Sequence, residues 1–233
     1  STIFTRAVSA IKSLLVQEDP RNRQTFEEHL SLRVAQTLQD SDAGHHLYPD
    51  ARIDTAHACG LTPIGDASGF AAMVAVPPED PNLVVKVCSD PQDGFVMFAL
   101  AVKMGLLDDT DQPIRLPVIH AVTRIGDEDR YVVVMERLET ADSLRGTQDG
   151  SREDFLARVR HPVSRSAANT ILGGLADYWD GYGDLHNGNW GIGKDDALVM
   201  FDPIGYAVFT VLGTGTDLTL QLPEDCTWDA EYD

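Results

Sequence analysis

The feature that most constrains this chain is a short polar stretch, Asp184-Leu185-His186-Asn187-Gly188-Asn189, with a second aspartate, Asp202, placed 13 residues after Asn189. An aspartate in such a stretch can orient a hydroxyl nucleophile and accept its proton. An amide oxygen and a carboxylate, supplied here by Asn189 and Asp202, can together hold Mg²⁺ against the phosphates of ATP. The pattern predicts a phosphoryl-transfer site in which Asp184 is the catalytic base and Asn189 and Asp202 are metal ligands.

A lysine lies upstream in a run that is otherwise wholly apolar. Residues 83–88 are rich in β-branched side chains and are bounded by prolines, which predicts a strand. A buried lysine is costly unless an anion faces it, and ATP phosphates would be that anion for Lys86. The alternative is an edge-strand lysine that points at solvent. Alternation along the strand places Val85 and Val87 on one face and Lys86 on the other.

A glycine-bearing stretch, residues 65–71, precedes this lysine. It lacks the middle glycine of a G-x-G-x-x-G pattern, because Ala67 stands at that position. Glycines in a hairpin let backbone N–H groups approach phosphates, although an ordinary turn is an equal interpretation of the stretch alone. Its place 17 residues before Lys86 favours a phosphate-covering loop. The predicted nucleotide contacts besides Lys86 are Gly65, Ser68, Gly69, Glu136 and Leu138.

Two further positions bear on the chemistry. His186 joins Asp184 and Lys86 as a candidate catalytic residue; it either donates to a phosphate or bonds the backbone to hold its own turn. The lysine of such a site usually pairs with a glutamate on the next helix, but residues 87–105 contain no glutamate. Asp93, near the start of that helix, is either a shorter substitute or an N-terminal cap, and we favour the cap.

The apolar spacing predicts an α+β chain. Two helices fill residues 1 to about 40, and a polar connection follows over 40–60. A strand, strand, helix, strand, strand order comes next, at 73–76, 83–88, 95–106, 118–125 and 131–137. Helices at 151–159 and 164–179 precede two short strands, 190–192 and 197–201, around a turn at 193–196. The predicted divisions are a helical extension (1–60), a β-rich lobe (61–138), a short helical lobe (139–222) and an acidic tail (223–233).

Composition limits the class of protein further. The net charge of −19 argues against direct nucleic-acid binding. It serves solubility, or it provides a docking surface for basic proteins or a mimic of DNA charge. No apolar run reaches the roughly 18 residues that span a bilayer, and no signal peptide opens the chain. The three cysteines show neither metal spacing nor a disulfide framework. We therefore expect a reduced, cytoplasmic protein without a membrane partner.

These motifs, in this order, resemble the early serine/threonine protein kinase of T7-like bacteriophages. The resemblance covers roughly residues 60–210 and is carried by the stretches around Lys86, Asp184 and Asp202, with a helical leader similar in kind. It implies a bilobal protein-kinase-like fold with a reduced C-lobe, ATP and Mg²⁺ as cofactors, and host proteins as substrates. Carried over by motif, Lys86 is the ATP lysine, Asp184 the catalytic aspartate, and Asn189 and Asp202 the metal ligands.

The resemblance also implies a setting and its partners. Kinases of this type act in the cytoplasm of the infected bacterium, on transcription or RNA-processing proteins, and modify themselves. Members of the family often carry a basic C-terminal extension linked to host shut-off. This chain ends acidic, so we expect no shut-off through such a segment.

Two other functions fit parts of the pattern. A kinase-shaped protein could inhibit a host factor by binding through its acidic surface, without catalysis. The Asp184 motif also resembles aminoglycoside and choline phosphotransferases, but those usually have a histidine where Tyr182 stands. They also need a larger helical lobe than this chain offers.

Overall fold

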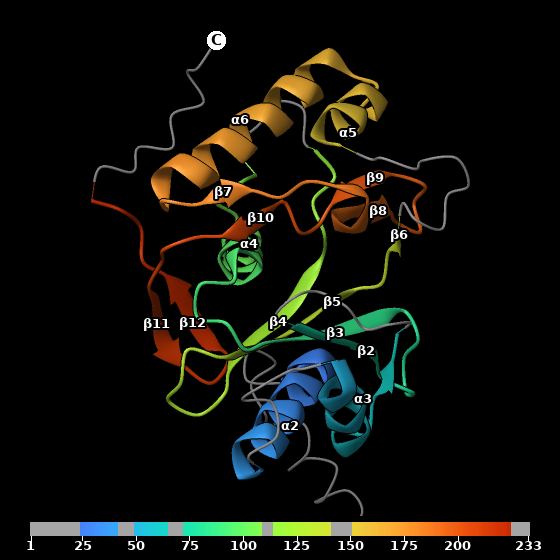
Figure 1. Ribbon diagram of the computed structural model, residues 1–233, viewed down its shortest axis with the longest axis vertical. Helices are drawn as coiled ribbons and strands as arrows, with labels where there is room; N and C mark the ends of the chain where they lie inside the picture. The colour runs from blue at the N-terminus through green and yellow to red at the C-terminus, as the bar shows by residue number, and fades with distance from the viewer. Residues whose placement is uncertain (1–23, 42–48, 65–71, 109–113, 141–150, 225–233) are drawn as a thin grey trace, which may run out of the picture.

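A five-stranded antiparallel sheet forms the centre of the first half of the chain (Figure 1). The computed structural model describes residues 24–41, 49–64, 72–108, 114–140 and 151–224. The strand order is β1-β2-β3-β5-β4. The strands are β1 (Thr62–Pro63), β2 (Ala72–Val76), β3 (Leu83–Cys88), β4 (Ile119–Arg124) and β5 (Tyr131–Glu136). The predicted strands are thus confirmed, and Gly126, at φ 60°, makes the β4–β5 turn.

Lys86 belongs to the middle strand of this sheet. On β3 it pairs with Val74 of β2 and Val133 of β5. The edge-strand alternative for this lysine is therefore wrong. The predicted alternation is confirmed, because Val85 and Val87 join the core on one face and Cys88 joins the core on the other.

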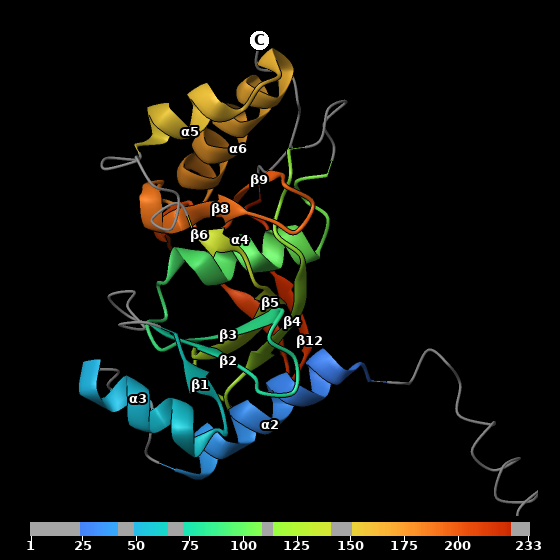
Figure 2. The same cartoon turned by 90° about the vertical axis from the view of Figure 1, so that its right-hand side faces the viewer.

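Two helices cover the outer face of the sheet, at the bottom of both ribbon views (Figures 1 and 2). The helix α2 (Phe26–Asp40) begins at a capping box in which Thr25 and Glu28 exchange side-chain and backbone hydrogen bonds. It confirms the second of the two predicted leader helices, while the first lies outside the described residues. The helix α3 (Pro49–Ala58) lies where we expected a connection. That prediction was wrong because α3 buries Arg52 and Thr55, which hide the apolar periodicity.

The opposite face of the sheet carries α4 (Gly94–Lys103), which lies between the sheet and the second half of the chain (Figure 2). Every residue from Gly94 to Ala101 is buried. A helix that is apolar all round is expected in such a sandwiched position. The predicted helix is confirmed, and its first turn stands directly beneath the lysine strand.

The second half of the chain contains two helices and several short strands. The helices α5 (Arg152–Arg158) and α6 (Pro162–Tyr178) confirm both predicted segments. One small sheet joins β6 (Glu139–Thr140), β8 (Trp190–Ile192) and β9 (Leu198–Met200). Another joins β7 (Tyr182–Gly183) to β10 (Ile204–Tyr206). The 3₁₀ helix η3 (Asn187–Asn189) lies between β7 and β8 in the sequence. None of the described helices is both long and apolar enough to cross a membrane.

The last hairpin returns to the first half of the molecule. Its strands are β11 (Val211–Thr214) and β12 (Asp217–Leu220). The backbone N–H of Arg124, at the end of β4, donates to Gly215 O at 3.0 Å, and its guanidinium donates to Val211 O at 2.6 Å. We did not predict this hairpin, whose strands are only four residues each, although polar and apolar residues alternate along β12.

The contact between α4 and β10 leads to the first prediction. A Cβ on Gly94 would lie 2.5 Å from the backbone oxygen of Ile204. We expect Gly94→Ala to lower the free energy of unfolding by about 1–3 kcal/mol, because backbone must move to relieve the overlap. Urea denaturation measures this change.

A matched substitution serves as the control. A Cβ on Gly173, inside α6, meets nothing within 4 Å. Gly173→Ala should therefore stabilise the protein by about 0.5–1 kcal/mol, through helix propensity alone. Equal destabilisation by both substitutions would contradict the close approach at Gly94.

Candidate active site

A cleft of about 690 Å³ lies where the sheet, the connector after β5 and the second half of the chain meet. This volume is within the usual range for sites that bind small molecules and nucleotides. Its walls combine apolar side chains with six charged ones. The lining residues include Ile64, Val74, Val84, Lys86, Phe95, Met135, Glu136, Leu138, Asn189, Phe201 and Asp202.

An ion pair between Lys86 and Asp202 lies in this cleft. Lys86 Nζ donates to Asp202 Oδ2 at 2.6 Å, and the two side chains are 12% and 19% exposed. Burial disfavours the ammonium, but the carboxylates of Asp202 and Asp93 outweigh it and hold the pKa of Lys86 above its usual value. Burial also raises the pKa of Asp202, and Asp93 and Asp184 add to the effect while Lys86 opposes it. Lys86 therefore remains a cation, and the negative charge of Asp202 depends on the presence of Lys86.

The first turn of α4 contacts the ammonium of Lys86 in place of the helix glutamate that usually pairs with such a lysine. The ammonium of Lys86 lies 3.7 Å from the centre of the Phe95 ring, a cation–π contact. Asp93 caps the helix by accepting a hydrogen bond from the Phe95 N–H at 3.0 Å. The favoured capping role of Asp93 is thus confirmed. Its charge also acts on Lys86, so capping and charge compensation coexist in one side chain.

The three predicted residues of the second half are held together by backbone hydrogen bonds. The N–H of Asp184 donates to Pro203 O at 2.7 Å, which ties the base to the segment after Asp202. The carbonyl of Asn189 accepts from the N–H groups of Phe201 and Asp202, each at 3.1 Å. The Asn189 amide Nδ2 donates to the backbone oxygen of Asp184 and, at 3.4 Å, to its carboxylate. The segments that carry residues 184, 189 and 202 are therefore joined directly to one another.

His186 stands beside the proposed base on an exposed turn. Its Nδ1 accepts a hydrogen bond from the Gly188 N–H at 3.1 Å, so this ring holds the turn that begins η3. Its Nε2 lies 3.8 Å from Asp184 Oδ2. The backbone-bonding role is present in the structure, and a role at a phosphate stays a prediction.

The predicted nucleotide contacts fall in three groups. Gly65, Ser68 and Gly69 lie outside the described residues. Leu138 lines the cleft. Glu136 also lines the cleft, but its carboxylate is already bound by Arg115 and by the N–H of Val118 at 2.8 Å. A ligand would therefore meet the Glu136 carboxylate only in competition with these partners.

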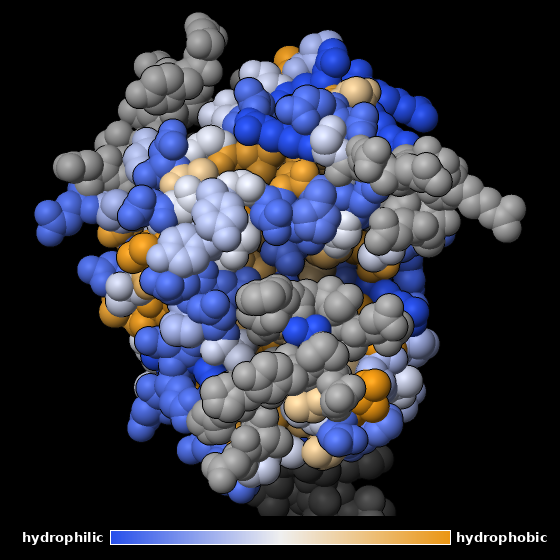
Figure 3. Space-filling view, in the orientation of Figure 1, coloured by the Kyte–Doolittle hydropathy of each residue, from blue (hydrophilic) through white to orange (hydrophobic). Residues whose placement is uncertain are grey.

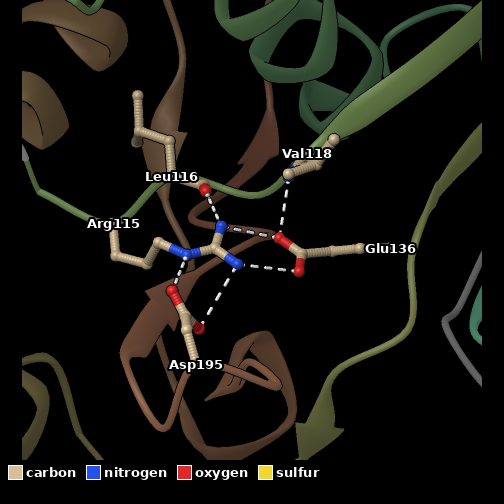
Figure 4. A network of polar contacts seen from close by, with 5 residues as sticks. All are labelled: Arg115, Leu116, Val118, Glu136 and Asp195. Atoms are coloured by element: carbon tan, nitrogen blue, oxygen red, sulfur yellow. Dashed lines mark hydrogen bonds and ion pairs between the residues drawn. The ribbon is translucent and has the colours of Figure 1, made fainter.

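Arg115 connects the end of β5 to the β8–β9 turn (Figure 4). Its guanidinium binds both oxygens of Glu136, at 2.7 and 2.8 Å, and donates through Nε to Asp195 at 2.8 Å. The carboxylate of Glu136 raises the pKa of Arg115, and Arg115 in turn lowers the pKa of Asp195. Asp195 lies in the turn predicted at 193–196, between β8 and β9. The network ties the connector at the cleft to the second half of the chain.

Sequence reasoning missed two residues of this site. Phe95 stood two residues after Asp93, in the predicted helix. An aromatic residue at the start of the helix that follows the lysine strand was a signal that could have been used. Arg115 is flanked by the apolar residues Ile114 and Leu116, and no local pattern in the sequence marks its partners.

Comparisons with known proteins give little beyond this geometry. No protein-family profile and no curated protein matches the sequence. Among solved structures, the chain is similar to a MAP kinase from Leishmania major, at 17% identity and a TM-score of 0.31, over 70% of this chain and 50% of that kinase. The chain thus spans about half the length of the kinase that it matches. With so low a TM-score, what the site can do is inferred from its own contacts.

The Lys86–Asp202 pair gives a second prediction. Lys86→Met leaves a nearly buried carboxylate without its cation, and we expect a loss of about 3 kcal/mol of folding free energy at neutral pH. The pKa of Asp202 in the folded variant should rise further above its unfolded value. Its protonation then favours the folded state, so stability recovers as the pH falls and is lost as the pH rises through the folded pKa. Denaturation as a function of pH measures both effects.

The double variant provides the control for this prediction. Lys86→Met with Asp202→Asn removes both charges, so it should be more stable at neutral pH than Lys86→Met alone. It should also lose the pH dependence. If the single and double variants unfold alike at every pH, the two side chains are not coupled.

The network at Arg115 gives a third prediction. Arg115→Leu removes the cation from a half-buried carboxylate, and we expect a loss of about 2 kcal/mol of folding free energy. The exposed pair between Arg33 and Glu79 is the matched control, because Arg33→Leu should cost less than about 1 kcal/mol. Thermal unfolding measures both, and a larger loss from Arg33→Leu would contradict the structural role of Arg115.

Proposed function

We propose that this protein transfers the γ-phosphoryl group of ATP to serine or threonine hydroxyls of protein substrates. The observation that carries the proposal is the Lys86–Asp202 ion pair in the cleft, joined by backbone hydrogen bonds to Asn189 and Asp184. Residues 86 and 202 are 116 positions apart in the sequence. Their convergence with the Asn189 amide in one cleft, and the contact of that amide with Asp184 beside the cleft, match the requirements of phosphoryl transfer.

The residues present suit a nucleotide and a magnesium ion. The cleft has an aliphatic wall, including Val84 and Leu138, on which a purine can pack, and a charged end at Lys86. Asn189 donates through its amide nitrogen to Asp184, so its amide oxygen stays available in the cleft. With a carboxylate oxygen of Asp202 it forms a two-residue set, and Mg²⁺ commonly binds one or two protein oxygens plus phosphates and water. The described residues hold no cluster of three or more metal-ligating side chains.

Each side chain has a role that follows from its position. Lys86 would hold the α- and β-phosphates, and Asn189 and Asp202 would hold Mg²⁺, which supplies charge neutralisation on the phosphates. Asp184 would orient the acceptor hydroxyl and accept its proton. His186 would keep the turn in shape through Gly188. Catalysis then consists mainly of positioning and of charge stabilisation in a water-poor cleft.

The biological setting extends this proposal. The motifs resemble those of early kinases of T7-like phages, which implies host proteins of transcription or RNA processing as substrates in the infected cytoplasm. Autophosphorylation belongs to the same expectation. These partners rest on the resemblance, whereas the chemistry rests on the cleft.

A second function has one observation in its favour. The helix α4 carries no glutamate for Lys86, and this lysine lies against Asp202 and the Phe95 ring instead. A protein that keeps the kinase shape but transfers phosphate poorly could inhibit a host factor by binding it. Phosphoryl transfer by the purified protein separates the two functions.

The fourth prediction tests the base. Asp184→Ala should reduce transfer of label from γ-labelled ATP to protein by about 10²–10⁴-fold, because the acceptor hydroxyl loses its proton acceptor. The same variant should keep nucleotide binding, because Asp184 is not part of the cleft lining. A thermal-shift titration with ATP and Mg²⁺ measures binding, since a ligand of the native state raises the melting temperature. Equal labelling by wild type and variant would exclude this role for Asp184.

A companion variant addresses the metal. Asp202→Asn should abolish the Mg²⁺-dependent part of the ATP thermal shift while keeping a side chain of the same size. If host-factor inhibition survives both Asp184→Ala and Asp202→Asn, binding rather than chemistry carries the function.

A further inference from the structure

A stacked pair of tyrosines lies next to the proposed base. The rings of Tyr182 on β7 and Tyr206 on β10 are parallel to within 6°, with centroids 5.8 Å apart. Tyr182 is 61% exposed, so much of its side chain stays open to solvent beside the contact with Tyr206. Tyrosine is enriched among the residues that carry most of the binding energy at interfaces. Nothing in the proposed phosphoryl-transfer roles uses this pair.

The position of the stack relative to Asp184 is fixed by Gly205. A Cβ on Gly205 would stand 3.1 Å from Tyr182 Cε2 and 3.3 Å from Asp184 Oδ2. The edge of the Tyr182 ring and the carboxylate of Asp184 therefore lie close to each other, with Gly205, which has no side chain, between them. An acceptor hydroxyl at Asp184 would place the adjoining part of its own chain over the tyrosines.

Acidic residues outnumber basic ones in the part of the chain that carries the stack. Residues 166–224 contain eight acidic residues and a single basic one, Lys194 in the β8–β9 turn. Asp177 and Asp180, both exposed, lie five and two residues before Tyr182 in the sequence, and Asp93 forms a backbone bridge with Tyr206. Figure 3 shows this face as a mixture of hydrophilic residues, in blue, and hydrophobic residues, in orange. A cation near this surface is attracted, and an anion is repelled.

We infer that Tyr182 and Tyr206 form an acceptor-binding platform that selects substrates with an arginine within about three residues of the phosphorylated serine or threonine. A planar guanidinium can continue the stack on the exposed side chain of Tyr182, where cation–π attraction and the neighbouring carboxylates act together. An extended peptide advances about 3.4 Å per residue, so an arginine within about three positions can reach the ring from Asp184. This inference rests on the proposed phosphoryl transfer and names the substrate class of that site.

Steady-state kinetics on three serine peptides tests the platform. The peptides share one length and differ only in whether arginine, alanine or glutamate flanks the serine. The wild type should show a KM for the arginine peptide at least about tenfold below that for the glutamate peptide, with the difference shrinking at high salt. Tyr182→Ala should raise the KM for the arginine peptide about fivefold with kcat unchanged, and Tyr182→Phe, which keeps the ring, should not.

A matched pair of aspartates tests the charge. Asp180 and Asp196 are the non-glycine residues with positive φ in the described chain, at 43° and 58°, and both are exposed. Asn tolerates this conformation, so both Asp→Asn changes remove one charge without straining the backbone. Asp180→Asn should raise the KM for the arginine peptide about two- to threefold, and Asp196→Asn should leave it unchanged.

A binding assay keeps the platform testable apart from catalysis. Fluorescence anisotropy of a labelled arginine peptide, with alanine in place of serine, reports binding without transfer. Weaker binding by Tyr182→Ala, but not by Tyr182→Phe, supports the platform even if no peptide is phosphorylated, which would count only against the proposed function. Equal binding by wild type and Tyr182→Ala, or no preference of the wild type for arginine over glutamate peptides, overturns the inference.

Discussion

The ion pair between Lys86 and Asp202 is the interaction on which the rest of the structure depends. The lysine comes from the middle strand of the sheet, where its side chain is only 12% exposed. A cation in that position requires an anion, and the only way to supply Asp202 is to fold the second half of the chain against the first. One electrostatic requirement thus fixes how the two halves face each other. The same requirement places a positive and a negative group in the cleft.

The pair is supported by side chains that have other structural duties. Asp93 begins α4, and Phe95 forms part of the core as well as the surface against the ammonium. Arg115 ties the connector at Glu136 to the turn at Asp195. Because these groups also hold helices and turns in place, the charge distribution of the cleft cannot change without moving the framework around it.

Local patterns predicted the parts of the fold that follow from local physics. Alternating apolar residues identified the four main strands of the sheet and the side of β3 that carries Lys86. Helical spacing identified α2, α4, α5 and α6, and α6 formed despite Gly173 and Gly174. The spacing from Asp184 to Asp202 identified the residues that come together. What failed depended on long-range contacts: α3 buries polar side chains, the β11–β12 hairpin is stabilised by Arg124, and Arg115 finds partners 21 and 80 residues away.

The return of the last hairpin to β4 has a mechanical consequence. The chain crosses from one half to the other after β5, and it crosses back between β10 and β11. The polypeptide chain therefore connects the two halves at two separate points. Rotation about the line through both crossings would leave both connections unstretched, whereas twisting or sliding of the halves would stretch at least one of them. A nucleotide would then enter and leave the cleft through this one rotation of the halves.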